Sequence, residues 1–234
     1  MLLAAGLGSR LKPWTDHHPK SLAIVNGKSL LQRNIEYLQQ YGINQVIVNV
    51  HHFADQIKEA IDKTKGWGST ISISDETEAV LETGGGLNYA AWFFDKDEFV
   101  LMNADVLTDM NLASMIQYHR LHAPLATLAV TNRRTSRYFL FDNDDNLCGW
   151  ENIKTGEVKL DKSAATVHQK AFSGIHVINP SIFSHITMQG KFSIVDLYLQ
   201  LSKNNKIKGF DHSDSNFIDV GKPESILLAE QLFH

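Results

Sequence analysis

Two glycines followed by two basic residues make the beginning of the chain suited to binding phosphate. Gly6 and Gly8 come directly after an apolar run at residues 2–5. Glycines at the end of a strand let the backbone turn tightly and present successive N–H groups to phosphate oxygens. Arg10 and Lys20 follow, and they can bind phosphate as a planar fork and as a point charge. The stretch therefore predicts a polyphosphate-binding loop.

Two other nucleotide-binding motifs do not fit the sequence. A dinucleotide fingerprint would need glycine where Leu11 stands. A P-loop would need glycine five residues before Gly27-Lys28-Ser29, and that position is Leu22. The phosphate loop predicted here is consequently of another kind.

Asp105 and Asp219 are candidate cation ligands, because carboxylate oxygens bind Mg²⁺ in proteins. Asp105 follows an apolar segment and Asn103, and Asp219 precedes a Gly-Lys-Pro turn. An aspartate in either position is also a common helix cap or turn former. Residue type alone leaves both interpretations open.

Composition limits the classes of protein to consider. The chain has 234 residues, 43% of them apolar and 21% charged, which is typical of a globular protein. Its net charge of −4 without a basic cluster argues against nucleic acid or an anionic membrane as a partner. The single cysteine, Cys148, cannot form an internal disulfide, and the opening apolar run is too short for a signal core or a membrane span. We expect a cytoplasmic protein in which Cys148 belongs to the core.

Strand-like and helix-like segments alternate in the first half. The apolar patterns predict strands at 2–5, 45–50, 70–74 and 99–102 and helices at 29–41, 55–63, 84–94 and 112–121. This order predicts an α/β fold with a doubly wound, mostly parallel, Rossmann-like sheet. Ligands of such sheets bind at the carboxyl ends of the strands, so the loops after residues 5, 50, 74 and 102 should line one crevice.

The second half has a different pattern. Residues 125–150 and 171–178 resemble longer strands, which predict a small antiparallel extension, and amphipathic helices are expected near 193–202 and 222–233. With no linker visible, we expect a single domain over 1–234. The first strand should be central although it begins at residue 1, so the sequence leaves open whether residues precede Met1.

The segment at residues 3–22, LAAGLGSRLKPWTDHHPKSL, closely resembles the N-terminal motif of the sugar-1-phosphate nucleotidyltransferases (nucleotide-sugar pyrophosphorylases). Later landmarks of that family follow in the expected order. Residues 82–86 are similar to its base- and sugar-contacting loop, in the glycine-rich variant of the N-acetylmuramate-1-phosphate uridylyltransferases and of some hexose- and heptose-1-phosphate nucleotidyltransferases. Residues 103–106, 172–175 and 217–223 resemble its metal-binding strand end, its sugar loop and its closing D-V-G-x-P segment.

The resemblance implies a nucleotide-diphospho-sugar transferase fold and a reaction. A sugar 1-phosphate attacks the α-phosphorus of a nucleoside triphosphate and pyrophosphate leaves, with UTP and N-acetylmuramate 1-phosphate as the expected pair. It implies that Asp105 and Asp219 hold Mg²⁺ and that Arg10 and Lys20 act with Asp105 in catalysis. Residues 1–122 would form the nucleotide-binding half and residues 123–234 the sugar-binding half. The oligomeric state is not predicted.

The resemblance also assigns contacts to the two substrates. The expected nucleotide-binding residues are Ala4, Ala5, Gly6, Gly8, Arg10, Glu82, Thr83 and Gly84. The expected sugar-binding residues are Gly85, Asn103, Glu151, Ser173 and Gly174. The glycines at 84–86 have a second interpretation, which is close packing at the start of a helix.

One position departs from the family. Many relatives carry Glu-Lys-Pro in the middle of the second half, where the lysine contacts the sugar phosphate, and this chain has Trp150-Glu151-Asn152. We therefore expect another cation there, with Lys170 as the first candidate and Lys154 and Lys159 as reserves.

Two alternative functions remain at this stage. One is a guanylyl- or cytidylyltransferase acting on a heptose or mannose 1-phosphate or on phosphocholine. The other is a catalytically silent nucleotide-sugar sensor, which the presence of Arg10, Lys20, Asp105 and Asp219 disfavours.

Overall fold

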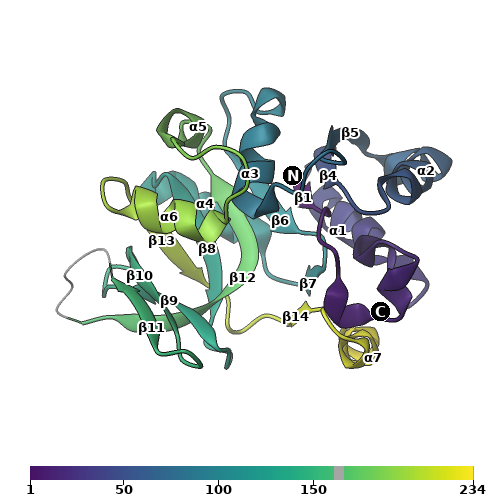
Figure 1. Ribbon diagram of the computed structural model, residues 1–234. Helices are drawn as coiled ribbons and strands as arrows, with labels where there is room; N and C mark the ends of the chain where they lie inside the picture. The colour runs from purple at the N-terminus through teal and green to yellow at the C-terminus, as the bar shows by residue number, and fades with distance from the viewer. Residues whose placement is uncertain (161–165, 234) are drawn as a thin grey trace.

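A ten-stranded mixed sheet forms the centre of the computed structural model, which describes residues 1–160 and 166–233 (Figure 1). Its strands are β1 (Leu2–Leu3), β4 (Gln45–Val50), β5 (Thr70–Asp75), β6 (Phe99–Asn103), β8 (Ala126–Thr131), β9 (Arg137–Phe141), β10 (Leu147–Asn152), β11 (Glu157–Leu160), β12 (His168–Ile178) and β13 (Ile207–Asp211). They run in the order β11-β10-β9-β12-β6-β1-β4-β5, with β8 between β12 and β13. β6, β1, β4 and β5 are parallel, and β12 joins β6 antiparallel. The predicted α/β fold with a parallel centre and an antiparallel extension is confirmed.

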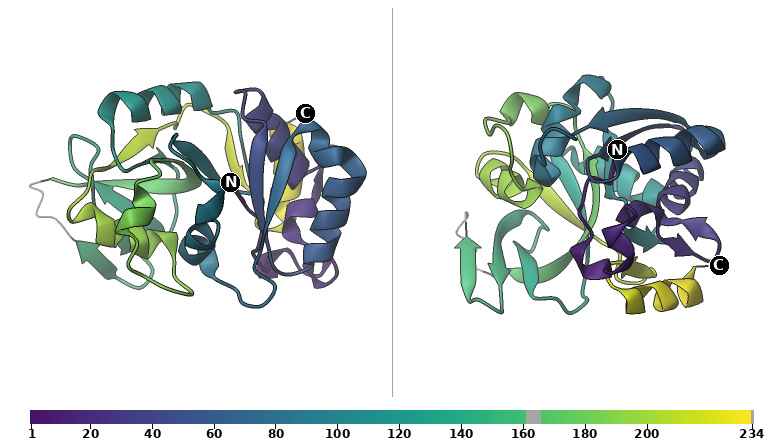
Figure 2. Two further views of the ribbon diagram at one scale, coloured as in Figure 1. Left: turned by 90° about the horizontal axis from the view of Figure 1, so that it is seen from above. Right: turned by 45° about the vertical axis from the view of Figure 1, so that its right-hand side comes forward.

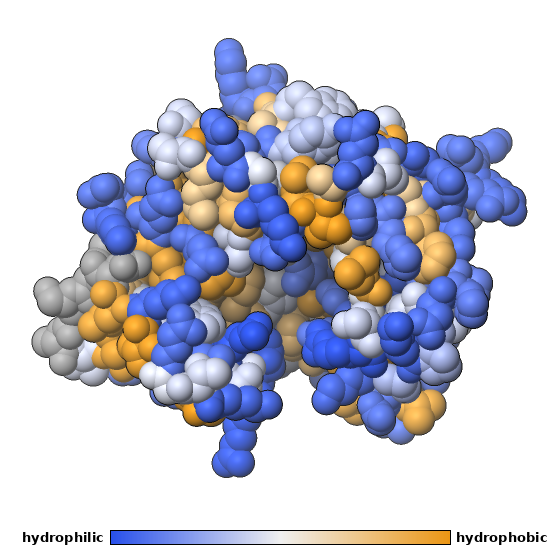
Figure 3. Space-filling model, viewed as in Figure 1, coloured by the Kyte–Doolittle hydropathy of each residue, from blue (hydrophilic) through white to orange (hydrophobic). Residues whose placement is uncertain are grey.

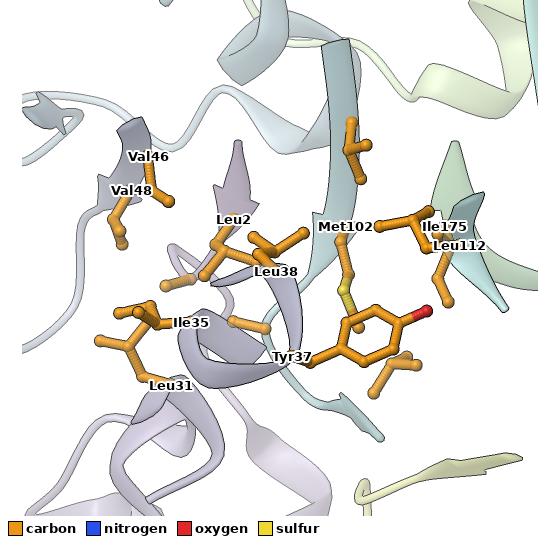
Figure 4. Close-up of a cluster of buried hydrophobic side chains, with 14 of the residues drawn as sticks. Leu2, Leu31, Ile35, Tyr37, Leu38, Val46, Val48, Met102, Leu112 and Ile175 are labelled. Carbon is orange, nitrogen blue, oxygen red and sulfur yellow. The ribbon is translucent and has the colours of Figure 1, made fainter. Parts of the chain in front are cut away.

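Helices cover both faces of this sheet because side chains alternate along its strands. They are α1 (Leu30–Gln39), α2 (Ala54–Thr64), α3 (Glu82–Tyr89), α4 (Leu112–His122), α5 (Ile182–His185), α6 (Ile194–Ser202) and α7 (Pro223–Leu232). Val46 and Val48 of β4 belong to one buried cluster with residues of α1, α2 and α4 (Figure 4). Ile47 belongs to a second cluster with α3 and α6 on the other face. Within the described residues, no helix is both long and apolar enough to cross a membrane.

The boundaries of some elements differ from the prediction. The helix expected at 84–94 begins at Glu82 and ends at Tyr89, followed by a 3₁₀ turn at Ala91–Phe93. The chain turns there because Phe94 stacks on Phe99 of β6 with 3.8 Å between ring centroids. The segment 125–150 holds three strands, β8, β9 and β10, and the short helix α5 was not predicted.

A two-stranded ribbon that the sequence did not reveal joins segments distant in the sequence, although the two chain ends themselves lie apart (Figure 2). β7 (Val106–Thr108) pairs antiparallel with β14 (Phe217–Asp219), more than a hundred residues later. Its strands have three residues each, too short for a periodic pattern. After β14, α7 packs on the hairpin of β2 (Ile24–Val25) and β3 (Lys28–Ser29), which Figure 1 shows as yellow beside purple. The ribbon thus places β14 beside the N-terminal loops.

Two glycines of α3 are required by packing. A Cβ on Gly84 would overlap the Phe192 ring, and one on Gly85 would overlap the backbone oxygen of Gly190. The N–H groups of both glycines also donate to the Phe192 oxygen, at 3.0 and 3.2 Å. The free N–H groups at a helix start can bind an anion, but here these two donors are engaged within the protein. Close approach of α3 to residues 190–192 accounts for the glycines.

Replacing Gly85 with alanine tests this packing, because helix propensity and steric overlap change the stability of the protein in opposite directions. An alanine normally stabilises a helix interior by about 1 kcal/mol relative to glycine. We expect Gly85→Ala to lower the free energy of unfolding by about 1–3 kcal/mol instead, because the methyl group meets a backbone oxygen that cannot rotate away. Urea denaturation of the two proteins measures the difference. The matched control is Gly6→Ala, where nothing lies within 4 Å of the added Cβ; a stabilised Gly85→Ala variant would contradict the packing account.

Candidate active site

The spacing of the first motif follows from how its loop folds on Gly8. Gly8 has φ +63°, and its missing Cβ leaves space into which Lys20 Cβ and Thr15 Cγ2 pack. The Thr15 hydroxyl donates to the Gly8 oxygen at 3.0 Å. The loop therefore buries Lys20, which is only 8% exposed, and fixes the direction of its side chain.

Lys20 joins the two predicted metal ligands. Its ammonium forms an ion pair with Asp105 and lies 3.6 Å from Asp219 Oδ1. Arg10 Nη2 lies 3.5 Å from Asp219 Oδ2. The four charged residues that sequence analysis singled out are thus one cluster with two positive and two negative charges. Their catalytic roles stay predictions, but their convergence is a property of the fold.

The β7–β14 ribbon explains how residues so distant in the sequence meet. Asp219 is in register with Val106, the residue after Asp105. The Val220 N–H donates to the Asp105 oxygen at 2.9 Å, which locks the two segments together. A Cβ on Gly221 would come within 3 Å of both Asp219 Oδ1 and Arg10 Nη2. The glycine of the closing segment therefore leaves room for the ion pair.

The donor set of this cluster fits a magnesium ion. Asp105 and Asp219 supply hard carboxylate oxygens, and Mg²⁺ is usually bound by one or two carboxylates together with water and substrate phosphates. Nowhere in the described chain do three or more His, Cys, Asp or Glu side chains form a group that could hold a metal. Two carboxylates beside a phosphate-binding loop are thus suited to an ion that also needs the substrates as ligands.

A cleft of about 380 Å³ opens beside the cluster. Figure 3 shows a hollow near the middle of the viewed face of the molecule. Five predicted site residues line this cleft together with Asp105; they are Ala5, Gly6, Glu82, Thr83 and Asn103. The carboxyl ends of β1 and β6 therefore meet the start of α3 at one crevice, as expected of an open α/β sheet.

Asn49 and Glu76 position the loop but were not among the predicted site residues. Asn49 Oδ1 accepts from the Ala4 N–H at 2.7 Å, and its Nδ2 donates to Glu76 Oε1 at 2.8 Å. Glu76 is 3% exposed, and its burial raises its pKa. The Ala4 N–H, which we expected at the nucleotide, is therefore used inside the protein. An asparagine within the apolar run at 45–50 was the one signal in the sequence.

The predicted sugar loop packs against Asn103. Gly174 has φ +72°, and the Asn103 amide occupies the space of its missing Cβ. Ser173 is 2% exposed, and its hydroxyl pairs with His212 Nε2 at 2.8 Å, while His212 Nδ1 pairs with Ser215 Oγ at 2.7 Å. Burial lowers the pKa of His212 to about 4, so its ring is neutral at pH 7. Ser173 thus braces the loop, and Gly174 is the residue that faces Asn103.

Glu151 lies elsewhere. It lines a separate cavity of the second half together with Lys170 and is absent from the cleft at Asp105. Lys170 donates to Asn132 Oδ1 at 2.8 Å and pairs with Asp211. Lys159 pairs with Asp196 at 3.1 Å. Acidic partners on β13 and α6 thus pair with Lys170 and Lys159, and the expectation that Lys170, Lys154 or Lys159 approaches the sugar phosphate stays a prediction.

A mixed sheet with a parallel centre, with a predicted phosphate loop and paired carboxylates at the ends of its strands, is typical of a nucleotide-binding class of protein. The family model named nucleotidyl transferase matches residues 1–234, and the chain belongs to this family. It is accordingly a nucleotidyltransferase. The predicted family resemblance is confirmed.

Relatives with different named substrates are similar to the chain at equal identity. An N-acetylmuramate alpha-1-phosphate uridylyltransferase of Caulobacter vibrioides is 28% identical over 98% of this chain and 94% of its own length. A mannose-1-phosphate guanylyltransferase catalytic subunit beta of Drosophila melanogaster is 28% identical over 100% of this chain, which spans 62% of that relative. The solved structure of HddC from Yersinia pseudotuberculosis with GMP-PN superposes with a TM-score of 0.79 at 23% identity, covering 100% and 98% of the two chains. This last likeness supports the fold.

The Lys20 cluster predicts how magnesium affects stability. Lys20→Met removes the cation between Asp105 and Asp219, which are 27% and 45% exposed. Without metal we expect this substitution to lower the free energy of unfolding by about 1–2 kcal/mol. The effect is smaller than for a fully buried ion pair because water still reaches both carboxylates. Mg²⁺ should restore much of this loss, since it replaces the missing positive charge. Thermal denaturation in EDTA and in MgCl₂ measures the effect.

Lys12→Met is the matched control, because Lys12 forms an exposed ion pair with Asp16 at 2.7 Å. Mg²⁺ should raise the Tm of Lys20→Met by more than that of wild type or Lys12→Met. Equal shifts in all three proteins would show that the two carboxylates do not share the ion.

Proposed function

We propose that this nucleotidyltransferase joins a nucleoside triphosphate to a sugar 1-phosphate with the aid of Mg²⁺ and releases pyrophosphate. UTP and N-acetylmuramate 1-phosphate are the proposed pair. The observation that carries the proposal is the convergence of Asp105 and Asp219 on Lys20, beside Arg10 and the open cleft. Such a cluster suits a reaction between two phosphate anions.

The proposed reaction needs positive charge and orientation more than a covalent nucleophile. A phosphate oxygen of the sugar 1-phosphate bonds to the α-phosphorus while the bond from that phosphorus to the bridging oxygen of pyrophosphate breaks. Arg10 is proposed to bind the β- and γ-phosphates, where charge grows as pyrophosphate leaves. Lys20 would hold the reacting phosphates together. Mg²⁺ held by Asp105 and Asp219 would neutralise phosphate charge and bring the two substrates together.

The two substrates are proposed to bind side by side, the nucleotide against the lining of the cleft and the sugar toward the loop of the second half that packs on Asn103. Residues 1–122 supply Ala5, Gly6, Glu82 and Thr83 to its lining and would bind the nucleotide. Residues 123–234 would bind the sugar through the loop at Gly174, which contacts Asn103. Gly84 and Gly85 would contribute indirectly, by letting α3 lie close to residues 190–192.

The named substrates of the relatives support the uridylyl proposal and one alternative. The Caulobacter vibrioides relative is named as an N-acetylmuramate alpha-1-phosphate uridylyltransferase, and the Drosophila melanogaster relative as a mannose-1-phosphate guanylyltransferase catalytic subunit. Equal identity to both keeps guanylyl transfer to mannose 1-phosphate as the second candidate. A silent sensor is disfavoured because the charged cluster at Lys20 is complete.

A substrate screen tests the pairing. Each of the four nucleoside triphosphates is combined with N-acetylmuramate, mannose, glucose and a heptose 1-phosphate, with pyrophosphate release as the readout. We expect UTP with N-acetylmuramate 1-phosphate to give the highest kcat/KM. A higher value for GTP with mannose 1-phosphate would make the second candidate correct. If none of the tested pairs gives pyrophosphate, the result would favour the nucleotide-sugar sensor.

The carboxylates provide a second test of the proposed function. Asp219→Asn keeps the size of the side chain but removes the charge, so we expect kcat to fall by about three orders of magnitude or more, corresponding to about 4 kcal/mol. Asp105→Asn should behave alike. Asp214→Asn, an exposed position on the same connection, is the control and should keep wild-type turnover. Wild-type turnover in Asp219→Asn would remove the metal from the proposal.

A further inference from the structure

The charges of the proposed substrates exceed the cations that the first half supplies. A phosphate monoester carries nearly two negative charges at pH 7, and the triphosphate brings more. Arg10 and Lys20 are both already close to Asp219, at 3.5 and 3.6 Å. Uncompensated charge in a closed site is costly. A cation from the second half would therefore lower the free energy of binding the sugar phosphate.

Arg133 is a second-half cation positioned differently from the lysines of the extension. It comes shortly after β8, and its guanidinium lies over the Phe217 ring, 5.0 Å from the centroid. Its Nη2 donates to the backbone oxygen of Phe172, the residue before Ser173 and Gly174. Arg133 thus spans from the loop that packs on Asn103 to the strand that carries Asp219.

Strand geometry places Arg133 on the side of β14 from which Asp219 extends. Residues two apart in a strand project from the same face, so Phe217 and Asp219 share one face. A guanidinium over the Phe217 ring lies on that face. The electrostatics agree, because burial lowers the pKa of Arg133 while the charge of Asp219 opposes this shift.

The remaining donors of Arg133 suit a phosphate. A guanidinium has five N–H groups in a fork that matches two phosphate oxygens. Among the described residues, the hydrogen bond recorded for Arg133 goes to Phe172. Arg133 keeps substantial solvent exposure although packing against Phe217 and Phe172 partly buries its guanidinium, so N–H groups other than the one bound to Phe172 can reach a ligand.

We propose that Arg133 binds the phosphate of the sugar 1-phosphate and supplies the positive charge that relatives obtain from the lysine of their Glu-Lys-Pro segment. This inference rests on the proposed function, because it assigns one phosphate to the wall formed by Phe172, Gly174 and β14. Arg10 and Lys20, which come from the N-terminal loop, remain for the triphosphate. Arg133 is then a substrate-binding residue that discriminates between the two anions.

Steady-state kinetics with each substrate varied separately tests the assignment. Arg133→Met keeps an unbranched side chain over Phe217 but removes the charge. We expect the KM for the sugar 1-phosphate to rise about tenfold or more, as for the loss of a hydrogen bond between charged groups. The KM for the nucleoside triphosphate should change less than about twofold. Arg133→Lys should recover part of the loss, because a lysine restores the charge but not the fork.

Arg134→Met is the matched control, since Arg134 is the exposed neighbour in the sequence. A purely structural role for Arg133, bracing Phe172 and Phe217, would lower the Tm and impair both substrates alike. An unchanged KM for the sugar 1-phosphate, or equal increases for both substrates, would overturn the proposal.

Protection by inorganic phosphate separates this inference from the proposed function. If no substrate pair leads wild type to release pyrophosphate, the proposed function fails. The binding of inorganic phosphate then tests the role of Arg133 independently of activity. We expect phosphate with MgCl₂ to raise the Tm of wild type and Arg134→Met by more than that of Arg133→Met. Equal shifts in the three proteins would contradict a phosphate site at Arg133.

Discussion

The ammonium of Lys20 between two carboxylates is the interaction on which the rest of the site depends. Asp105 and Asp219 would repel each other if nothing positive lay between them. Lys20 supplies that charge before any substrate or ion binds, and it comes from a third segment of the chain. The phosphate loop, the end of β6 and the β7–β14 ribbon must therefore form together. An electrostatic condition of this kind links the catalytic arrangement to the fold.

Glycines make this arrangement of charges possible, because they allow side chains of the site to approach the backbone closely. Lys20 packs where Gly8 has no Cβ, Arg10 and Asp219 meet beside Gly221, and Asn103 lies on Gly174. In each case part of a polar side chain of the site occupies the volume that another residue type would fill. The glycines at 84–85 allow close packing between α3 and residues 190–192. A glycine-rich motif can thus combine electrostatic and purely steric requirements.

Much of the architecture could be predicted from the sequence because it has a local signature. Strands and helices of the first half have apolar periodicities, and the residues at Gly8, Arg10 and Lys20 have a spacing that one loop imposes. The Asn49–Glu76 link to Ala4, the His212 contact of Ser173 and the β7–β14 ribbon have none, since each joins segments distant in the sequence. The position of Glu151 has no local signature either. Its strand lies on the extension, where a sequence motif does not specify distance from the cleft, and its role in binding the sugar stays a prediction.

The acidic partners of each cation in residues 123–234 determine whether its positive charge remains available to a substrate. Lys170 stands closest in sequence to the sugar loop, yet Asp211 and Asn132 of the neighbouring segments hold it. Arg133 is more distant in sequence, and its recorded contacts are a ring and a backbone oxygen. Neither of these neutralises a positive charge, whereas an aspartate does. Arg133 has the charge of Asp219 nearby, but it forms no ion pair with a carboxylate among the described residues, so it is freer to bind an incoming phosphate than a lysine already paired with an aspartate.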